Sequence, residues 1–423
     1  MLAELYARWM YAWETRLTTR DTNRVVRPVE WGFDWLEDFS RAQGISFDGL
    51  DPEDHAAAEA AMLNLNERIL RDPESFFAYR TPIDFELEER APALFPTNVR
   101  PETLRREAKL LRKAEEGRLA AAQFLRFTSP IRTMYPENDR VNARWFPASP
   151  ERAGGGPKRA IVMLPQWNAD AFSHNALCAA AARFGVSALR LSKPYHDIRR
   201  PVGLERADYA VSSNIGRTIA SCRQAVVDIR CALDWLEGQG YEQFGVLGTS
   251  LGSCYAFLAS AFDPRLTVNA FNHASMSFGD VVWTGQSTRH IRASFESVGL
   301  TQERLGNLWA AISPSRHMDR FAAHRKKVLV VYAEYDLTFL KQYSLEVLRS
   351  FRERDVDFTA RRLPCGHYTT GEIPFKFLDG WHLGSFVYSA FRERTGGAPQ
   401  DRKDRAQSGG VLPPERPAAG EML

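Results

Sequence analysis

The sequence predicts an α/β protein in which helices flank a mostly parallel sheet. From about residue 121 onward, short apolar runs alternate with amphipathic helical segments, an order typical of β-α-β units. Several of these runs are apolar without alternation, as expected for strands that are buried on both faces. The chain has 423 residues, of which 44% are hydrophobic, enough for one large domain and a second element.

Residues 1–118 carry helical signals and no convincing strand, so we expect a helical N-terminal extension. Asp54 ends a capping sequence before an alanine-rich helix that runs to Arg71. A second, charged helix is expected to begin at Pro101. The first twenty residues lack the basic start and cleavage site of a signal peptide, and they predict an amphipathic helix. Peripheral contact of that helix with a membrane surface stays open.

Residues 119–395 are expected to form the main domain. The predicted strands, in chain order, are 121–131, 140–147, 159–163, 186–191, 244–247, 266–271, 327–332 and 358–363. The predicted helices are 172–184, 210–237, 254–262, 339–353 and 376–393. Residues 275–325 interrupt this rhythm with an aromatic, helical segment, which is either a cap over a site or an ordinary crossover. The tail, 396–423, is rich in Gly, Pro and charge and is predicted to be disordered.

Composition argues against several classes of partner. The formal net charge is only +3 and no extended Lys/Arg run occurs, so nucleic acid is not an expected partner. The five cysteines lack metal-ligand spacing, which predicts thiols in a reducing cytoplasm and no metal site. No phosphate-binding glycine motif occurs, so no cofactor is expected. No apolar run approaches the roughly 18 residues of a membrane-spanning helix.

Gly248-Thr249-Ser250-Leu251-Gly252 is the most informative local motif. It follows the apolar run FGVL and precedes the apolar run CYAFLASAF, so it is expected at a strand–turn–helix junction. Such a sharp turn exposes a serine hydroxyl and needs small residues on both sides of it. Ser250 is therefore the candidate nucleophile, and a structural serine in a glycine-rich turn is the alternative.

A serine hydroxyl becomes a good nucleophile only beside a base that an acid holds in place. KVLVVYAEYD delivers Asp336 just past a predicted strand, at the sheet edge where catalytic groups gather, with Glu334 and Asp280 as rival acids. RRLPCGHYTTG places His367 in a loop after the last predicted strand. An imidazole titrates near neutral pH and can take the serine proton. We therefore expect His367 as base and Asp336 as the acid that orients it.

Backbone N–H groups are expected to stabilise the oxyanion that such an attack creates. One donor is the N–H of Leu251, directly after the nucleophile. The second is expected in the loop after AIVMLP, where the N–H of Trp167 is favoured over that of Gln166.

A second polar segment, KPYHDIRRP, also follows a predicted strand and so is expected at the same edge. Tyr195 and Arg199 are candidate substrate-binding residues, because a guanidinium suits carboxylate and phosphate groups. The alternative is a structural turn with solvated arginines. His196 and Asp197 are adjacent and belong to no larger cluster, which disfavours a metal pair.

With Ser250, Asp336 and His367 in this order, residues 121–395 resemble the α/β-hydrolase superfamily. LDWLEGQGYEQFGVLGTSLGS and KPYHDIRRP are similar to the group around abhydrolase domain-containing protein 18. The resemblance implies a Ser-His-Asp site that acts on acyl esters, thioesters or amides. Two features depart from many relatives: Pro165-Gln166 replaces His-Gly in the oxyanion loop, and Ser253 replaces a glycine after the serine motif.

These observations predict an enzyme that cleaves an acyl ester through an acyl-enzyme on Ser250, with a small-molecule or lipid-like acyl substrate. An acyltransferase with the same residues is the nearest alternative, because an alcohol can resolve the acyl-enzyme in place of water. A catalytically silent protein that binds a ligand or partner on the same fold is the alternative from another class.

Overall fold

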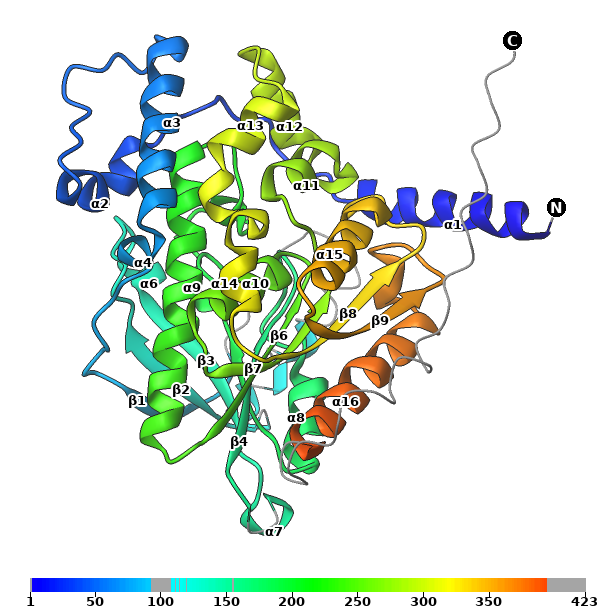
Figure 1. The fold of residues 1–423 in the computed structure, drawn as a ribbon. Coiled ribbons are helices and arrows are strands. Elements are labelled where there is room, and N and C mark those ends of the chain that lie inside the picture. Colours follow the sequence, from blue (N-terminus) through cyan, green and yellow to red (C-terminus); the bar gives the residue numbers. More distant parts are fainter. Residues whose placement is uncertain are drawn as a thin grey trace.

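A computed structural model describes residues 2–92, 108–110, 112–113, 115–118, 120–153 and 156–393. Its centre is a nine-stranded sheet in the order β1-β2-β3-β5-β4-β6-β7-β8-β9 (Figure 1). The strands are β1 (Glu86–Arg90), β2 (Ala122–Thr128), β3 (Arg140–Phe146), β4 (Arg159–Leu164), β5 (Ser187–Leu191), β6 (Gln243–Thr249), β7 (Leu266–Asn272), β8 (Lys327–Ala333) and β9 (Asp357–Leu363). The pairs β1–β2, β2–β3 and β3–β5 are antiparallel, and all pairs from β5 through β4 to β9 are parallel. The predicted α/β architecture with a mostly parallel sheet is confirmed.

Helices cover both faces of the sheet. Outside the 275–325 segment, the described α-helices of the main domain are α6 (Pro136–Asp139), α7 (Pro150–Ala153), α8 (Asn175–Arg183), α9 (Ile215–Gly238), α10 (Leu251–Phe262), α15 (Lys341–Glu353) and α16 (Phe375–Glu393). Neighbouring residues of one strand point to opposite faces. Ile161 of β4 accordingly packs in a core with α8 and α16, while Val162 packs in a larger core with α9, α10 and α15.

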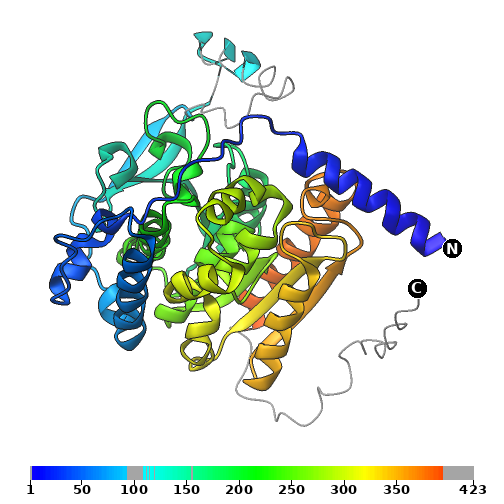
Figure 2. The same ribbon diagram turned by 90° about the horizontal axis from the view of Figure 1, so that it is seen from above.

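The N-terminal extension contains α1 (Leu2–Thr19), α2 (Glu37–Ala42), α3 (His55–Arg71) and α4 (Pro73–Phe76). The predicted cap of α3 is present, because the Asp54 side chain accepts a hydrogen bond from the Ala57 N–H at 3.1 Å. Figure 2 shows α1 along one edge of the domain, beside the C-terminal elements. None of the described helices is long and apolar enough to cross a membrane.

The expectation that residues 1–118 hold no strand is wrong, because β1 adds an edge strand to the sheet. Its sequence, ELEER, has no apolar alternation because most of its side chains face solvent. Ion pairs take the place of apolar packing: Arg140 lies 3.0 Å from Glu86, and Arg126 lies 3.5 Å from Glu88. Most of the helix expected from Pro101, and the whole 396–423 tail, lie outside the described residues.

Residues 275–325 form a helical segment between β7 and β8, with α11 (Phe278–Thr284), α12 (Arg289–Ser297), α13 (Gln302–Leu308) and α14 (Met318–Ala322). The N-terminal extension is fastened to this segment. Asn66 of α3 donates to the Leu308 carbonyl at 2.7 Å and accepts from the Ala311 N–H at 3.1 Å. Arg304 of α13 donates to Glu59 of α3 at 2.8 Å.

A backbone contact joins the extension to the start of α9. The Gly216 N–H donates to the Trp31 carbonyl at 2.9 Å. A Cβ at Gly216 would lie 1.9 Å from the Gly32 carbonyl oxygen, so the two segments can approach only because this residue is glycine.

We expect Gly216→Ala to lower the free energy of unfolding by about 2 kcal/mol, since the added methyl meets backbone that cannot yield. Urea unfolding followed by circular dichroism measures the change. Gly238→Ala is the matched control on the same helix, because a Cβ there meets nothing within 4 Å. Equal midpoints for the two variants would show that the contact does not fasten the extension.

Candidate active site

Ser250 lies at the junction between β6 and α10. Its backbone angles, φ 56° and ψ −121°, lie in the positive-φ region that residues other than glycine rarely adopt. The flanking glycines allow this turn. A Cβ at Gly248 would lie 2.2 Å from the Gly252 carbonyl oxygen, and a Cβ at Gly252 would lie 2.2 Å from the Leu164 carbonyl oxygen. The motif therefore has the geometry that exposes a nucleophile at the carboxyl end of a strand.

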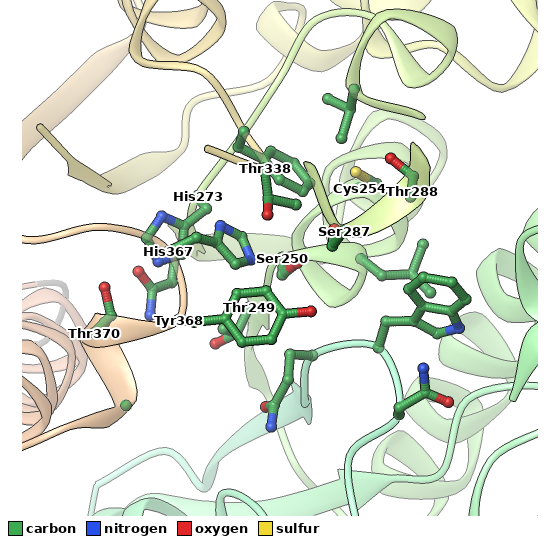
Figure 3. A pocket seen from close by; sticks show the side chains of 18 of the residues that line it. Thr249, Ser250, Cys254, His273, Ser287, Thr288, Thr338, His367, Tyr368 and Thr370 are labelled. Carbon is green, nitrogen blue, oxygen red and sulfur yellow. Dashed lines mark hydrogen bonds between the residues drawn. The ribbon is translucent and has the colours of Figure 1, made fainter. Parts of the chain in front are cut away.

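The structure brings the three predicted residues Ser250, His367 and Asp336 together. Figure 3 shows His367 beside Ser250. His367 Nε2 lies 2.9 Å from Ser250 Oγ, and His367 Nδ1 lies 2.9 Å from Asp336 Oδ2. Asp336 follows β8, and its other oxygen accepts the N–H groups of Thr338 and Phe339, both at 2.7 Å. Two backbone hydrogen bonds therefore fix the orientation of the Asp336 carboxylate independently of its contact with the imidazole.

The rival acids do not reach the histidine. Glu334 lies two residues before Asp336 and pairs instead with Lys341 at 2.7 Å. Asp280 lies on α11 and accepts a hydrogen bond from Gln302 at 2.7 Å.

Neighbouring carboxylates raise the pKa of His367. Burial by itself would lower the pKa of His367, but the Asp336 carboxylate and the more distant Glu14 carboxylate raise it above its ordinary value. Burial would likewise raise the pKa of Asp336, yet the two imidazoles beside it, His367 and His273, lower it. Asp336 is therefore ionised at neutral pH, as an orienting group must be.

His273 is a site residue that the sequence did not predict. It follows β7 directly, is 1% exposed, and its Nδ1 lies 3.1 Å from Asp336 Oδ2. Its ring centroid lies 4.3 Å from that of His367. The donor atoms of His273, Asp336 and His367 are close enough together to suggest a metal site. Both ring nitrogens of His367 are already engaged, however, so the cluster fits an imidazole pair around one carboxylate better than a set of ligands.

The predicted oxyanion residues Leu251, Trp167 and Gln166 line the same cavity as Ser250. Within the described part of the chain, neither the Leu251 N–H nor the Trp167 N–H donates a hydrogen bond. Both N–H groups are therefore available as donors in the cavity.

The KPYHD segment supports the loop of residues 166–168. Lys193 Nζ donates to the Gln166 carbonyl at 3.0 Å, and His196 Nε2 accepts the Asn168 N–H at 3.2 Å. Lys193 and His196 are both buried. Burial, followed by nearby positive charge, holds the pKa of each well below its usual range.

The expectation that Tyr195 and Arg199 bind substrate is wrong, because both are 0% exposed and neither lines the cavity. Arg199 forms a buried ion pair with Asp228 at 2.8 Å and donates to the Asn138 and Ser192 carbonyls. A buried guanidinium needs such partners, so its charge is already used within the fold.

A cavity of about 560 Å³ opens onto Ser250. The 275–325 segment supplies an apolar part of its wall, including Phe278, Val281 and Val282. The N-terminal extension contributes Arg20 and Asp21. Three separate parts of the chain thus line the cavity at Ser250.

Glu14 of α1 holds the loop that carries His367. Its carboxylate is 0% exposed and accepts the N–H groups of Tyr368 and Thr369 at 2.8 and 3.0 Å. A Cβ at Gly366 would lie 2.4 Å from Glu14 Oε2, so the carboxylate packs directly against the loop backbone. The N-terminal helix is therefore part of the support of the proposed base.

We expect Glu14→Gln to slow the reaction of Ser250 with a fluorophosphonate probe by about tenfold. The glutamine side chain has only one acceptor oxygen, so its amide nitrogen would face the N–H of Tyr368 or of Thr369, and one hydrogen bond to the loop would be lost. The charge change has its own signature. A reactive His367 must be neutral, and loss of the Glu14 charge lowers its pKa, so the rise of labelling rate with pH moves to lower pH.

Glu4→Gln, an exposed change on the same helix, serves as control and keeps the wild-type profile. A slower Glu14→Gln enzyme with an unmoved pH profile would contradict the electrostatic part of this role.

No protein-family model matches the chain, and comparison with curated proteins gives no match. Among solved structures, the acetyl xylan esterase from Paenibacillus sp. R4 superposes with a TM-score of 0.51 at 11% identity, over 78% of this chain and 93% of that one. Acetyl xylan esterase 1 from Thermoanaerobacterium sp. JW/SL YS485 gives 0.49 at 14% identity, over 79% and 93%. An acylaminoacyl peptidase from Pyrococcus horikoshii gives 0.47 at 12% identity, over 64% of this chain and 41% of that one. The first of these likenesses shows the fold, which is the α/β-hydrolase fold.

Proposed function

We propose that the protein is a serine hydrolase that cleaves a carboxylic ester or a related acyl bond through an acyl-enzyme on Ser250. The observation that carries the proposal is the continuous hydrogen-bond chain from Ser250 through His367 to Asp336 at the wall of a closed-in cavity. This order of hydroxyl, imidazole and carboxylate supports the roles of nucleophile, base and orienting acid that we propose for them.

In the proposed mechanism, Ser250 Oγ attacks the acyl carbon while its proton passes to His367 Nε2. The Leu251 and Trp167 N–H groups stabilise the negative oxygen of the tetrahedral intermediate. His367 then returns the proton to the departing alcohol, which leaves the acyl group on Ser250. Water, deprotonated by the same imidazole, releases the acid and restores the serine.

The substrate we propose is a small-molecule or lipid-like acyl ester, because a cavity of this volume has an apolar wall from α11 and polar groups opposite. The likeness of KPYHDIRRP and of the serine motif to the abhydrolase domain-containing protein 18 group rests on those residues alone. We also propose a reducing, cytoplasmic location, which is supported by five cysteines that are all buried and unpaired.

Labelling with a fluorophosphonate probe tests the nucleophile. Wild-type protein is expected to label at Ser250, and Ser250→Ala to remain unlabelled. His367→Ala and Asp336→Asn are expected to slow labelling by about 10³-fold or more, since each removes activation of the hydroxyl. Labelling is measured by gel fluorescence and the site by peptide mass spectrometry. If folded wild-type protein stays unlabelled, the enzyme proposal is wrong, and a catalytically silent protein that binds a ligand or partner on this fold is favoured.

Acyl transfer is the second candidate, and the burial of the site favours it. Ser250 is 6% exposed and lies beneath the 275–325 segment, an arrangement that limits the access of bulk water. An acyl-enzyme in such a place reacts with whichever acceptor binds beside it.

Products formed from a model ester with and without added glycerol separate the two activities. A hydrolase is expected to release free acid at an unchanged rate, with little transfer product. An acyltransferase is expected to make mainly the glycerol ester and to turn over faster when glycerol is present. Chromatography of both products decides between them.

A further inference from the structure

A buried lysine contacts the turn that carries one of the proposed oxyanion donors. Lys193 is 2% exposed, and its Nζ donates to the Gln166 carbonyl at 3.0 Å. The Asp197 carboxylate, which acts on the charge of Lys193, is itself paired with Arg190. Lysine is almost never buried to this extent unless its charge is paired, and burying it against a carbonyl is costly. That cost points to a functional reason for the contact with Gln166.

The turn itself spans residues 166–169 and follows β4. The Ala169 N–H donates to the Gln166 carbonyl at 3.2 Å, and Asn168 has φ 55°, as in a type II turn. On the other side of the turn, His196 Nε2 accepts the Asn168 N–H at 3.2 Å. The KPYHD segment therefore holds a carbonyl at the start of the turn and an N–H near its end.

The Gln166 carbonyl and the Trp167 N–H belong to the same peptide unit. This peptide is trans. Because a trans peptide is planar, its C=O and N–H point in opposite directions. Gln166 and Trp167 line the cavity at Ser250, whereas Lys193 is not among the described residues that line it. The carbonyl is thus held on the side away from the cavity, which leaves the cavity side to the N–H.

We propose that Lys193 is a positioning residue for the oxyanion hole, because its bond to the Gln166 carbonyl turns the Trp167 N–H toward the cavity. Rotation of an unanchored peptide would present a carbonyl oxygen where the substrate oxygen becomes negative. A positive charge at the carbonyl also polarises the peptide, which strengthens its N–H as a donor. The inference rests on the proposed function, because it needs the oxyanion that attack by Ser250 creates.

The test compares p-nitrophenyl butyrate with its thiono analogue, in which sulfur replaces the carbonyl oxygen. Sulfur is a weak hydrogen-bond acceptor, so the preference for the ester reports on the oxyanion hole. This preference is the ratio of the two kcat/KM values, divided by the same ratio for alkaline hydrolysis. Lys193→Met, close in size but without a donor, is expected to lower kcat for the ester about 10²-fold. KM is expected to stay within about threefold, and the preference to fall at least about tenfold.

Lys326→Met is the matched control. Lys326 is also buried and donates to a backbone carbonyl, that of Leu266, at 3.3 Å. Leu266 begins β7, so this contact lies at the opposite edge of the sheet from Ser250. Lys326→Met is therefore expected to keep the wild-type preference. Lys193→Gln, whose amide ends one bond short of the lysine nitrogen, is a second variant with a polar side chain, and it is expected to lower the preference at least about threefold.

Circular dichroism shows which variants are folded. A wild-type preference in the folded Lys193 variants, even at a lower overall rate, overturns the proposed role, because a purely structural defect slows both substrates alike. If wild-type protein neither turns over these substrates nor labels at Ser250, the proposed function itself is wrong. The role of Lys193 and the proposed function therefore fail on different measurements.

Discussion

The close approach of the α10 backbone to the ends of β4 and β6 is the constraint on which the site depends. Gly248 and Gly252 have no side chain, so α10 starts in contact with the Leu164 and Pro165 carbonyls. That contact turns Ser250 into a positive-φ conformation and aims its hydroxyl away from the sheet. It also places the start of α10 against the residues that lead into the Gln166–Asn168 loop. One steric condition thus positions the proposed nucleophile and brings the proposed oxyanion donors to it.

The same edge of the sheet is then closed by parts of the chain that are distant in sequence. Glu14 holds the loop of His367, and α3 holds the 275–325 segment through Asn66 and Glu59. The KPYHD segment supports the oxyanion loop from below through two buried side chains. Loops are the least rigid parts of most folds. Here buried side chains of α1 and of the KPYHD segment form hydrogen bonds to backbone groups of the loops that carry His367 and the proposed oxyanion donors.

The sequence allowed prediction of what has a local signal. The glycine-flanked serine, the order of Asp336 and His367, and the apolar strands all depend on short patterns. His273 follows β7 with no motif around it, and Glu14 is one of several charged residues on an amphipathic helix. The sequence therefore does not predict the contact of His273 with Asp336 or that of Glu14 with the loop of His367. β1 has no sequence pattern of this kind, because an exposed edge strand needs no apolar alternation. The prediction for Arg199 is wrong because a buried, paired guanidinium and a solvated one have the same sequence signature.

The bond between Glu14 and the loop of His367 also sets an order on biosynthesis. The Glu14 carboxylate and the Tyr368 N–H are 354 residues apart. At ordinary rates of translation, roughly 20 to 70 s separate the emergence of the two from a ribosome. During that interval α1 has been synthesised, but the C-terminal residues against which it packs have not. Tyr6 and Trp13, for example, contact Tyr335 and Phe375 in the folded protein. The proposed acid–base pair is therefore among the last parts of the molecule to assemble, and a partly made chain carries Ser250 without the histidine proposed to activate it.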